Sequence, residues 1–177
     1  MNYKTEWVYL DGKASWVQAH KPNQWNKWSM QLHLSQKSLD YLRELIAEKG
    51  LKTQIKKDDD GWYIRLGRPT QLTLKTGKIV GMTQPEIFDS NHPFKDDEGN
   101  ITGYPILVEP VGNGSDCVVK CDLYQYTIPM TQGKKGHALR WNSVRIDTLV
   151  PFNKKSLDER TVNQAEGLND QPKQAAW

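Results

Sequence analysis

Hydrophobic and polar residues alternate with a two-residue period along most of this chain, which is the pattern of β-strands with one buried face. The clearest stretch is 28–34, in which Trp28, Met30, Leu32 and Leu34 point to one side. The same period predicts further strands or strand pairs over 12–21, 51–57, 62–66, 71–82, 118–126 and 138–150. The sequence therefore predicts a β-rich domain whose strands each have an inward and an outward face.

One segment has the period of a helix instead. Between residues 35 and 50, Leu39, Leu42, Leu45 and Ile46 fall on one helical stripe, with a serine at the start and a glycine at the end. We expect this stripe to pack on the core rather than to form a binding groove. Many short strands with one early helix favour a small β-barrel with an insertion over an α/β sheet, which needs a helix between most strands.

The apolar periodicity ends near residue 152. We predict one domain over 1–152 and a flexible, polar C-terminal tail over 153–177, which ends in Trp177. The chain has a mean hydropathy of −0.75, and it has no apolar run long enough to span a membrane. Its first residues lack the apolar stretch of a signal peptide, so we expect a cytoplasmic protein.

The two cysteines, Cys117 and Cys121, lie four residues apart in an alternating segment. Their side chains therefore share a face with Val119, which favours two buried thiols in a core strand. Along a strand this spacing corresponds to about 13 Å, which is too far for a disulfide. The four histidines show no metal-binding spacing, so the sequence predicts no zinc site.

Tryptophan and tyrosine are abundant, with 7 of each against 3 phenylalanines, and several fall on outward strand faces or loops beside Lys or Arg. Exposed rings can stack on bases and cations can neutralise phosphates, and neither interaction depends on base sequence. The net charge of +3 permits this function without requiring it. The pattern predicts a surface for single-stranded nucleic acid made of Trp16, Lys21, Trp25, Tyr63, Arg65, Lys120, Tyr124, Tyr126, Lys134, Lys135 and Arg140.

These residues also have structural interpretations. A tyrosine on a strand is often half-buried in a cross-strand pair. One β-bulge would reverse the direction in which Trp16 points. The lysines at 134–135 lie in a glycine loop, where solvated lysines are common. Three further tryptophans we assign to the core: Trp28, Trp62 and Trp141.

Signals of catalysis are few. The sequence lacks a phosphate-binding glycine loop and a nucleophile elbow. The acidic runs 58–60 and 96–98 lie at glycine turns, where solvated aspartates are usual. A nuclease would have to assemble a magnesium site from separated carboxylates such as Asp89, Asp122 and Asp147. We therefore predict no catalytic residue, no metal and no cofactor.

Two segments carry a family resemblance. The first is 110–115, Pro-Val-Gly-Asn-Gly-Ser, followed by an alternating strand that reaches Tyr124-Gln125-Tyr126. The second is 133–146, which begins Gly-Lys-Lys-Gly and continues through Leu-Arg-Trp-Asn. In this order, over about 105–150, the chain resembles the second half of bacteriophage single-stranded DNA-binding proteins of the OB-fold type.

The resemblance implies a five-stranded OB-fold barrel with one helix and extra hairpins, and no enzymatic activity. It implies a phage-encoded monomer or homodimer in the host cytoplasm, which coats and protects single-stranded DNA in replication, recombination and repair. It places the DNA contacts on the outward aromatics and cations, and it makes 112–115 a structural turn. Such proteins often recruit the replisome, for example polymerase or helicase-primase, through an acidic tail with a terminal aromatic residue. This chain keeps the aromatic, Trp177, on a tail that carries two basic and four acidic residues from Ser156 onward.

Three rival functions stay open on the sequence. An RNA-binding OB module would prefer RNA in a competition with DNA. A small metal-dependent phage nuclease would cleave its substrate when the metal is added. A β-barrel that binds only protein through its aromatics would show no salt-dependent affinity for oligonucleotides.

Overall fold

The structure, a computed structural model, describes residues 5–128 and 130–152. Its strands form one seven-stranded sheet and two separate two-stranded hairpins. In chain order the elements are β1 (Glu6–Gln18), β2 (Lys27–Leu34), α1 (Gln36–Lys49), β3 (Lys56–Asp58), β4 (Gly61–Pro69), β5 (Gln71–Thr73), β6 (Ile79–Gly81), β7 (Glu86–Asp89), β8 (Phe94–Lys95), β9 (Ile101–Gly103), β10 (Ser115–Thr127) and β11 (Lys135–Thr148).

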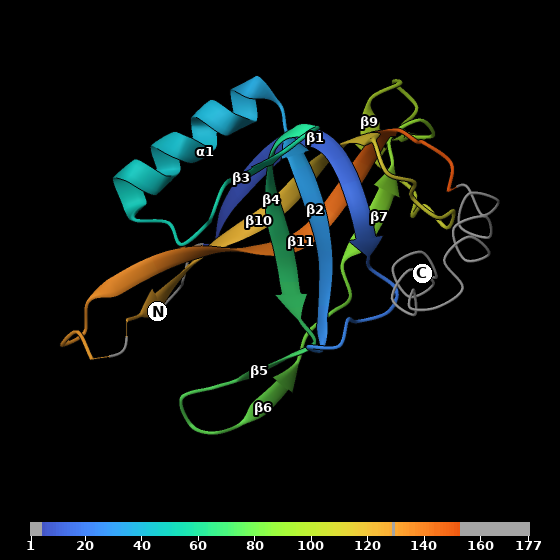
Figure 1. The fold of residues 1–177 in the computed structure, drawn as a ribbon. Coiled ribbons are helices and arrows are strands. Elements are labelled where there is room, and N and C mark those ends of the chain that lie inside the picture. Colours follow the sequence, from blue (N-terminus) through green and yellow to red (C-terminus); the bar gives the residue numbers. More distant parts are fainter. Residues whose placement is uncertain (1–4, 129, 153–177) are drawn as a thin grey trace, which may run out of the picture.

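Five long strands build a small barrel (Figure 1). β4, β2, β1, β10 and β11 are antiparallel neighbours in that order, and the short β3 and β7 extend the two edges. The sheet curls until β11 reaches β4, where Arg68 Nη1 donates to the carbonyl oxygen of Trp141 at 3.3 Å. An all-β, OB-like barrel with one helix and extra hairpins confirms the predicted fold class. The predicted tail, 153–177, lies outside the described residues.

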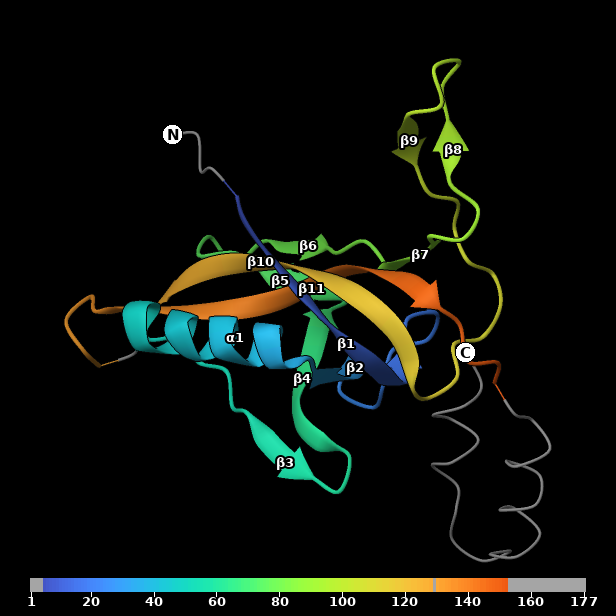
Figure 2. The same ribbon diagram turned by 90° about the horizontal axis from the view of Figure 1, so that it is seen from above.

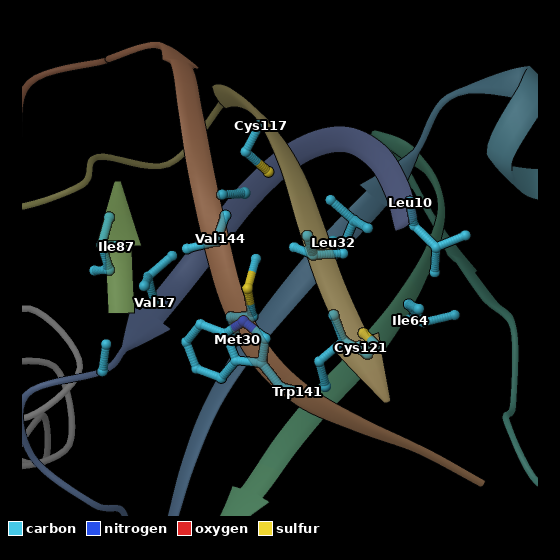
Figure 3. Packing of buried hydrophobic residues seen from close by; sticks show 14 of the residues in the cluster. Leu10, Val17, Met30, Leu32, Ile64, Ile87, Cys117, Cys121, Trp141 and Val144 are labelled. Atoms are coloured by element: carbon cyan, nitrogen blue, oxygen red, sulfur yellow. The ribbon is translucent and has the colours of Figure 1, made fainter. Parts of the chain in front are cut away.

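The inward side chains of these strands make one hydrophobic core. Trp28, Met30 and Leu32 of β2 are buried, as the alternation predicted. Trp141 of β11 is also buried as predicted, with 0% of its surface exposed, and it belongs to the same cluster as Met30 and Ile64 (Figure 3). The core is therefore assembled from strands that are far apart in the sequence.

Both cysteines lie in this core, which confirms their predicted burial. Burial raises the pKa of the Cys117 thiol to about 12. Burial also raises the pKa of the Cys121 thiol. Both groups are therefore protonated and apolar in the folded protein at neutral pH.

A β-bulge divides β1 into two parts. Before the bulge Leu10 and Ala14 point inward, and after it Val17 and Ala19 do. The inward positions thus change from even to odd numbers where the register with β2 shifts, around Trp16. Because of this shift, Val17 and Ala19 are buried and Trp16 is half-buried, whereas an unbroken alternation over 12–21 would have put Trp16 on the same side as the buried Ala14.

The predicted helix is confirmed as α1. Ser35 is its N-cap and accepts the backbone N–H of Ser38 at 3.2 Å, and Gly50 closes it in the left-handed conformation with a φ of 62°. Leu42 and Leu45 reach the core of the barrel. Nowhere in the described ranges does a helix have the length and apolar character needed to cross a membrane.

Two hairpins decorate the barrel. The strand pair predicted over 71–82 is confirmed as the β5–β6 hairpin, whose turn contains Gly77 at a φ of 83°. The polar segment 89–104 holds the β8–β9 hairpin, which stands away from the barrel (Figure 2).

The prediction that Trp62 belongs to the core was wrong. Trp62 is 36% exposed, although the next residues of the same face, Ile64 and Leu66, are buried. The β3–β4 hairpin projects from the barrel, so the first residue of this face lies beyond the core (Figure 2). The indole lies instead under two cations, with Arg43 Cζ at 5.3 Å and Lys57 Nζ at 5.2 Å from its ring centroid. The strand predicted over 51–57 is also shorter, since only β3 forms.

Arg68 is buried at the seam between β4 and β11. Its Nε donates to the carbonyl oxygen of Thr83 at 2.6 Å, and its Nη2 donates to the hydroxyl of Thr83 at 2.9 Å. Together with the bond to Trp141, these contacts join β4, β11 and the segment after β6. Burial, and then the nearby Arg140, lower the pKa of the guanidinium.

We expect Arg68→Ala to lower the free energy of unfolding by about 2–4 kcal/mol, because it removes the donor to the buried carbonyl oxygen of Trp141 and the donor to the part-buried carbonyl oxygen of Thr83. Urea denaturation followed by circular dichroism measures the loss. Arg65→Ala is the matched control, since Arg65 is exposed on the same strand and should change stability by less than about 0.5 kcal/mol. Equal losses in the two variants would contradict a structural role for the seam.

Candidate nucleic-acid interface

An open groove of about 890 Å³ lies beside the end of β1 and the loop that leads to β2. Four of the predicted nucleic-acid contacts line it: Trp16, Lys21, Trp25 and Arg65. The ladders explain how they meet, since Ser15 pairs with Gln31 and Gln31 pairs with Arg65 across three strands. The other lining residues are mostly polar, namely Gln18, Pro22, Asn23, Gln24, Ser29, Met30 and Gln31.

Trp16 is positioned by hydrogen bonds to its backbone. Its φ of 52° lies in the left-handed region, which a bulky residue adopts only when its surroundings require it. Its N–H donates to Asn113 Oδ1 at 2.9 Å, and the N–H of Gly114 donates to the carbonyl oxygen of Ala14 at 2.8 Å. The turn 112–115 therefore fixes the bulge that carries this indole.

Trp25 projects from the loop between β1 and β2 and is 70% exposed. Asn23 Oδ1 accepts the backbone N–H groups of Trp25 at 2.9 Å and of Lys27 at 3.2 Å. The N–H of Thr70 also donates to the carbonyl oxygen of Asn26 at 3.0 Å, which ties the loop to the end of β4. The backbone of the loop is thus ordered while the ring faces solvent.

Arg65 and Tyr63 share the outward face of β4, but only Arg65 lines the groove. Arg65 is exposed, opposite Gln31 of β2. Tyr63 is half-buried and lies against its cross-strand partner His33, with ring centroids 5.3 Å apart. Tyr63 therefore fits the cross-strand interpretation, and it extends the aromatic surface only next to the groove.

A second set of predicted residues lies on the β10–β11 hairpin. Tyr124 and Tyr126 have ring centroids 6.4 Å apart, and Arg140 Cζ lies 5.1 Å from the Tyr124 ring centroid. Burial raises the pKa of Tyr124. Tyr126 lies on Gly136, where a Cβ atom would come within 2.6 Å of the ring. Lys120 precedes both tyrosines on β10. The predicted contacts thus form two sets carried by different strands.

The hairpin also carries the two lysines of the glycine loop. Lys134 and Lys135 are exposed, and Lys135 Nζ donates to the hydroxyl of Thr127 at 2.7 Å. Both stay predicted phosphate contacts at the outer end of β10 and β11.

Asp122 has the same parity along β10 as Lys120 and Tyr124, which predicts an outward side chain, but the structure buries it, with 6% exposed. Its Oδ2 accepts from Arg140 Nε at 3.0 Å, while its Oδ1 has no hydrogen-bond partner among the described residues. Asp89 pairs with a histidine at 2.6 Å and Asp147 with an arginine at 2.7 Å. The three carboxylates considered for a magnesium site are therefore each engaged by a different side chain.

Another carboxylate cluster lies at the turn between β3 and β4. Across the described residues, the group of three side chains close enough to hold a metal ion is His33, Asp58 and Asp60. His33 Nε2 lies 2.9 Å from Asp58 Oδ2, and this hydrogen bond lowers the pKa of Asp58. Sequence spacing could not show this cluster, because β2 and β3 are brought together only by the fold.

Two outward aromatics of β1, Trp7 and Tyr9, were not among the predicted residues. They are 39% and 56% exposed, while Val8 and Leu10 between and after them are buried. The alternation over 6–10 was available in the sequence and would have identified both rings. The amides that line the groove, Gln18 and Gln31 among them, carry no such signal.

Fold and groove together define an OB-like β-barrel with an aromatic and basic surface groove, an architecture suited to extended chains such as oligonucleotides. The solved structure of gp2.5, a single-stranded DNA-binding protein encoded by bacteriophage T7, shares this fold, with a TM-score of 0.52. The two sequences are 16% identical, and the match covers 88% of this chain and 94% of that chain. This match confirms the fold that the sequence resemblance implied.

Two structures of the single-stranded DNA-binding protein from bacteriophage Enc34 are also similar, with lower TM-scores. The first is 14% identical, covers 90% of each chain and has a TM-score of 0.48. The second, in complex with single-stranded DNA, is 14% identical, covers 83% of this chain and 89% of that chain and has a TM-score of 0.45. No protein-family model and no curated protein sequence matches the chain.

Proposed function

We propose that this protein binds single-stranded DNA without sequence specificity. The observation that carries the proposal is the groove, in which the indoles of Trp16 and Trp25 lie together with the cations of Lys21 and Arg65. The fold shared with a phage single-stranded DNA-binding protein supports the same function.

The groove offers two kinds of interaction. Bases stack on the indoles, and each stacked base contributes about 1–3 kcal/mol. Lys21 and Arg65 neutralise phosphates, and the release of counterions makes the affinity fall with salt. Neither interaction reads a base edge, so binding is independent of sequence. The amides of the lining add hydrogen bonds that adapt to any base.

The proposed function includes the role expected from the resemblance. The protein coats and protects single-stranded DNA during phage replication, recombination and repair, in the cytoplasm of the host, as a monomer or homodimer. It needs no catalysis and no cofactor. Replisome proteins are the proposed partners of the tail and its Trp177. On the hairpin, the proposed DNA contacts are Lys120, Tyr124, Tyr126, Lys134, Lys135 and Arg140.

A titration with oligo-dT and with the matching duplex, at low and moderate salt, tests the function through tryptophan emission. We expect strong, salt-sensitive quenching by oligo-dT and little by the duplex, because paired bases cannot reach the indoles. A competition with oligo-rU separates DNA from RNA binding. No response to any oligonucleotide would refute the proposal.

The two cations of the groove should appear in the salt dependence. We expect Arg65→Ala and Lys21→Ala each to reduce the slope of log K against log salt by about 0.7, the value for one phosphate contact on a single strand. Lys95→Ala is the matched control, since Lys95 is exposed on the separate β8–β9 hairpin. If both groove variants have the slope of the wild type, Lys21 and Arg65 do not contact the phosphates of the bound DNA.

A further inference from the structure

The outer face of the ribbon formed by β1, β10 and β11 carries aromatics that the groove does not use. The three strands lie side by side, and Trp7 and Tyr9 of β1 pair with Asp122 and Lys120 of β10 (Figure 1). Their neighbour Val8 is 1% exposed, so the two rings point away from the core, with 39% and 56% of their surface exposed. The core therefore does not account for these large side chains.

This face also carries positive charge beside its rings. Lys120 Nζ lies 4.1 Å from the ring centroid of Trp7, a cation–π contact that covers one side of the indole. Asp122, the carboxylate nearest to Trp7 in the ladder, is buried and paired with Arg140 at 3.0 Å. Its negative charge is thus compensated by Arg140, and the half-buried Lys120 lies against the indole of Trp7.

The surface continues along β10 past the buried Asp122. Lys120, Tyr124 and Tyr126 are spaced by even numbers of residues on the outward side of the strand, and Arg140 of β11 covers Tyr124 at 5.1 Å. Rings alternate with cations over three strands, which is the composition of a stacking platform for a phosphate-bearing chain. The centre of a protein-binding interface would instead be apolar and depleted of charge.

We propose that this face is a second subsite for single-stranded DNA, in which Trp7 and Tyr9 stack on bases and Lys120 contacts phosphate. We refer to it as the ribbon subsite, made of Trp7, Tyr9, Lys120, Tyr124, Tyr126 and Arg140. The inference rests on the proposed function and extends it, because a strand longer than the groove engages both subsites. A short strand is held by the groove alone.

The test compares oligo-dT of about 5 and about 20 nucleotides, within and beyond the range of sites occupied by single OB folds. For the Trp7→Ala/Tyr9→Ala variant, which loses two stacking interactions, we expect the long oligonucleotide to bind about thirty-fold or more weakly, with the short one unchanged. Tyr9→Ala alone and Lys120→Gln serve as milder variants. Lys120→Gln should reduce the salt slope for the long oligonucleotide by about 0.7. Tyr41→Ala, on an exposed ring of α1, is the control.

The outcomes separate the two proposals. If the wild type binds both lengths and every ribbon variant binds the long one equally well, the ribbon subsite and the proposed contact of Lys120 are wrong, while the proposed binding of single-stranded DNA by the groove stands. Equal losses for both lengths in folded variants would also overturn it, because Trp7 and Tyr9 would then act through the groove. If the wild type binds neither length, the proposed function fails and the ribbon subsite with it.

Discussion

Replacing both indoles of the groove, in Trp16→Ala/Trp25→Ala, is expected to weaken the binding of oligo-dT about thirty-fold or more. The figure follows from two lost stacking interactions of about 1–3 kcal/mol each. The salt dependence should stay close to that of the wild type, because Lys21 and Arg65 remain. Fluorescence anisotropy of a labelled oligonucleotide measures the affinity without relying on tryptophan emission.

Trp62→Ala is the matched control for this variant. Trp62 is also partly exposed, but its indole lies beside Arg43 and Lys57 and outside the groove. We expect its loss to leave the affinity for oligo-dT within about two-fold of the wild type. A folded double variant that binds as tightly as Trp62→Ala would show that the groove is not the stacking site.

The second large effect concerns the core. Trp141→Ala should lower the free energy of unfolding by about 3–5 kcal/mol, because it removes a fully buried ring and leaves a cavity. The indole N–H also donates to the carbonyl oxygen of Ser143 at 3.2 Å, which then loses its donor. Since small domains are stable by about 5–15 kcal/mol, a large part of the total would be lost.

Urea denaturation of Trp141→Ala and Trp141→Phe measures this effect. The Phe variant should lose less, because it fills part of the cavity. Trp25→Ala provides the surface comparison and should change stability by about 0.5 kcal/mol at most. A loss below about 1 kcal/mol in Trp141→Ala would contradict a core organised around this ring.

The sequence predicted the parts of the fold that depend on local periodicity. The strand over 28–34 and the helix with its serine cap agree with the structure because every residue in them obeys one period. The predicted burial of Trp62 was wrong. Its residue does share a face with the buried Ile64 and Leu66, but the strand extends past the end of the core. Burial depends on where the barrel ends, and periodicity carries no information on that.

The candidate site was predicted in part for the same reason. Residue types alone identified Trp16, Trp25 and Arg65, yet the ladders that join β1, β2 and β4 bring them into one groove. The conformation of Trp16 depends on Asn113, which is 97 residues away in the chain. Such a contact has no local signal, so the sequence could show the chemistry of the site but not its shape.

The two core thiols make this chain convenient to label. A cysteine reacts with maleimides as the thiolate, and burial raises the pKa of Cys117 to about 12 and also raises that of Cys121. Both native thiols are thereby protected in the folded protein, so neither has to be removed. A single cysteine introduced at the exposed position of Gln125, on the β10–β11 hairpin, would carry one fluorophore and test whether single-stranded DNA approaches this part of the protein.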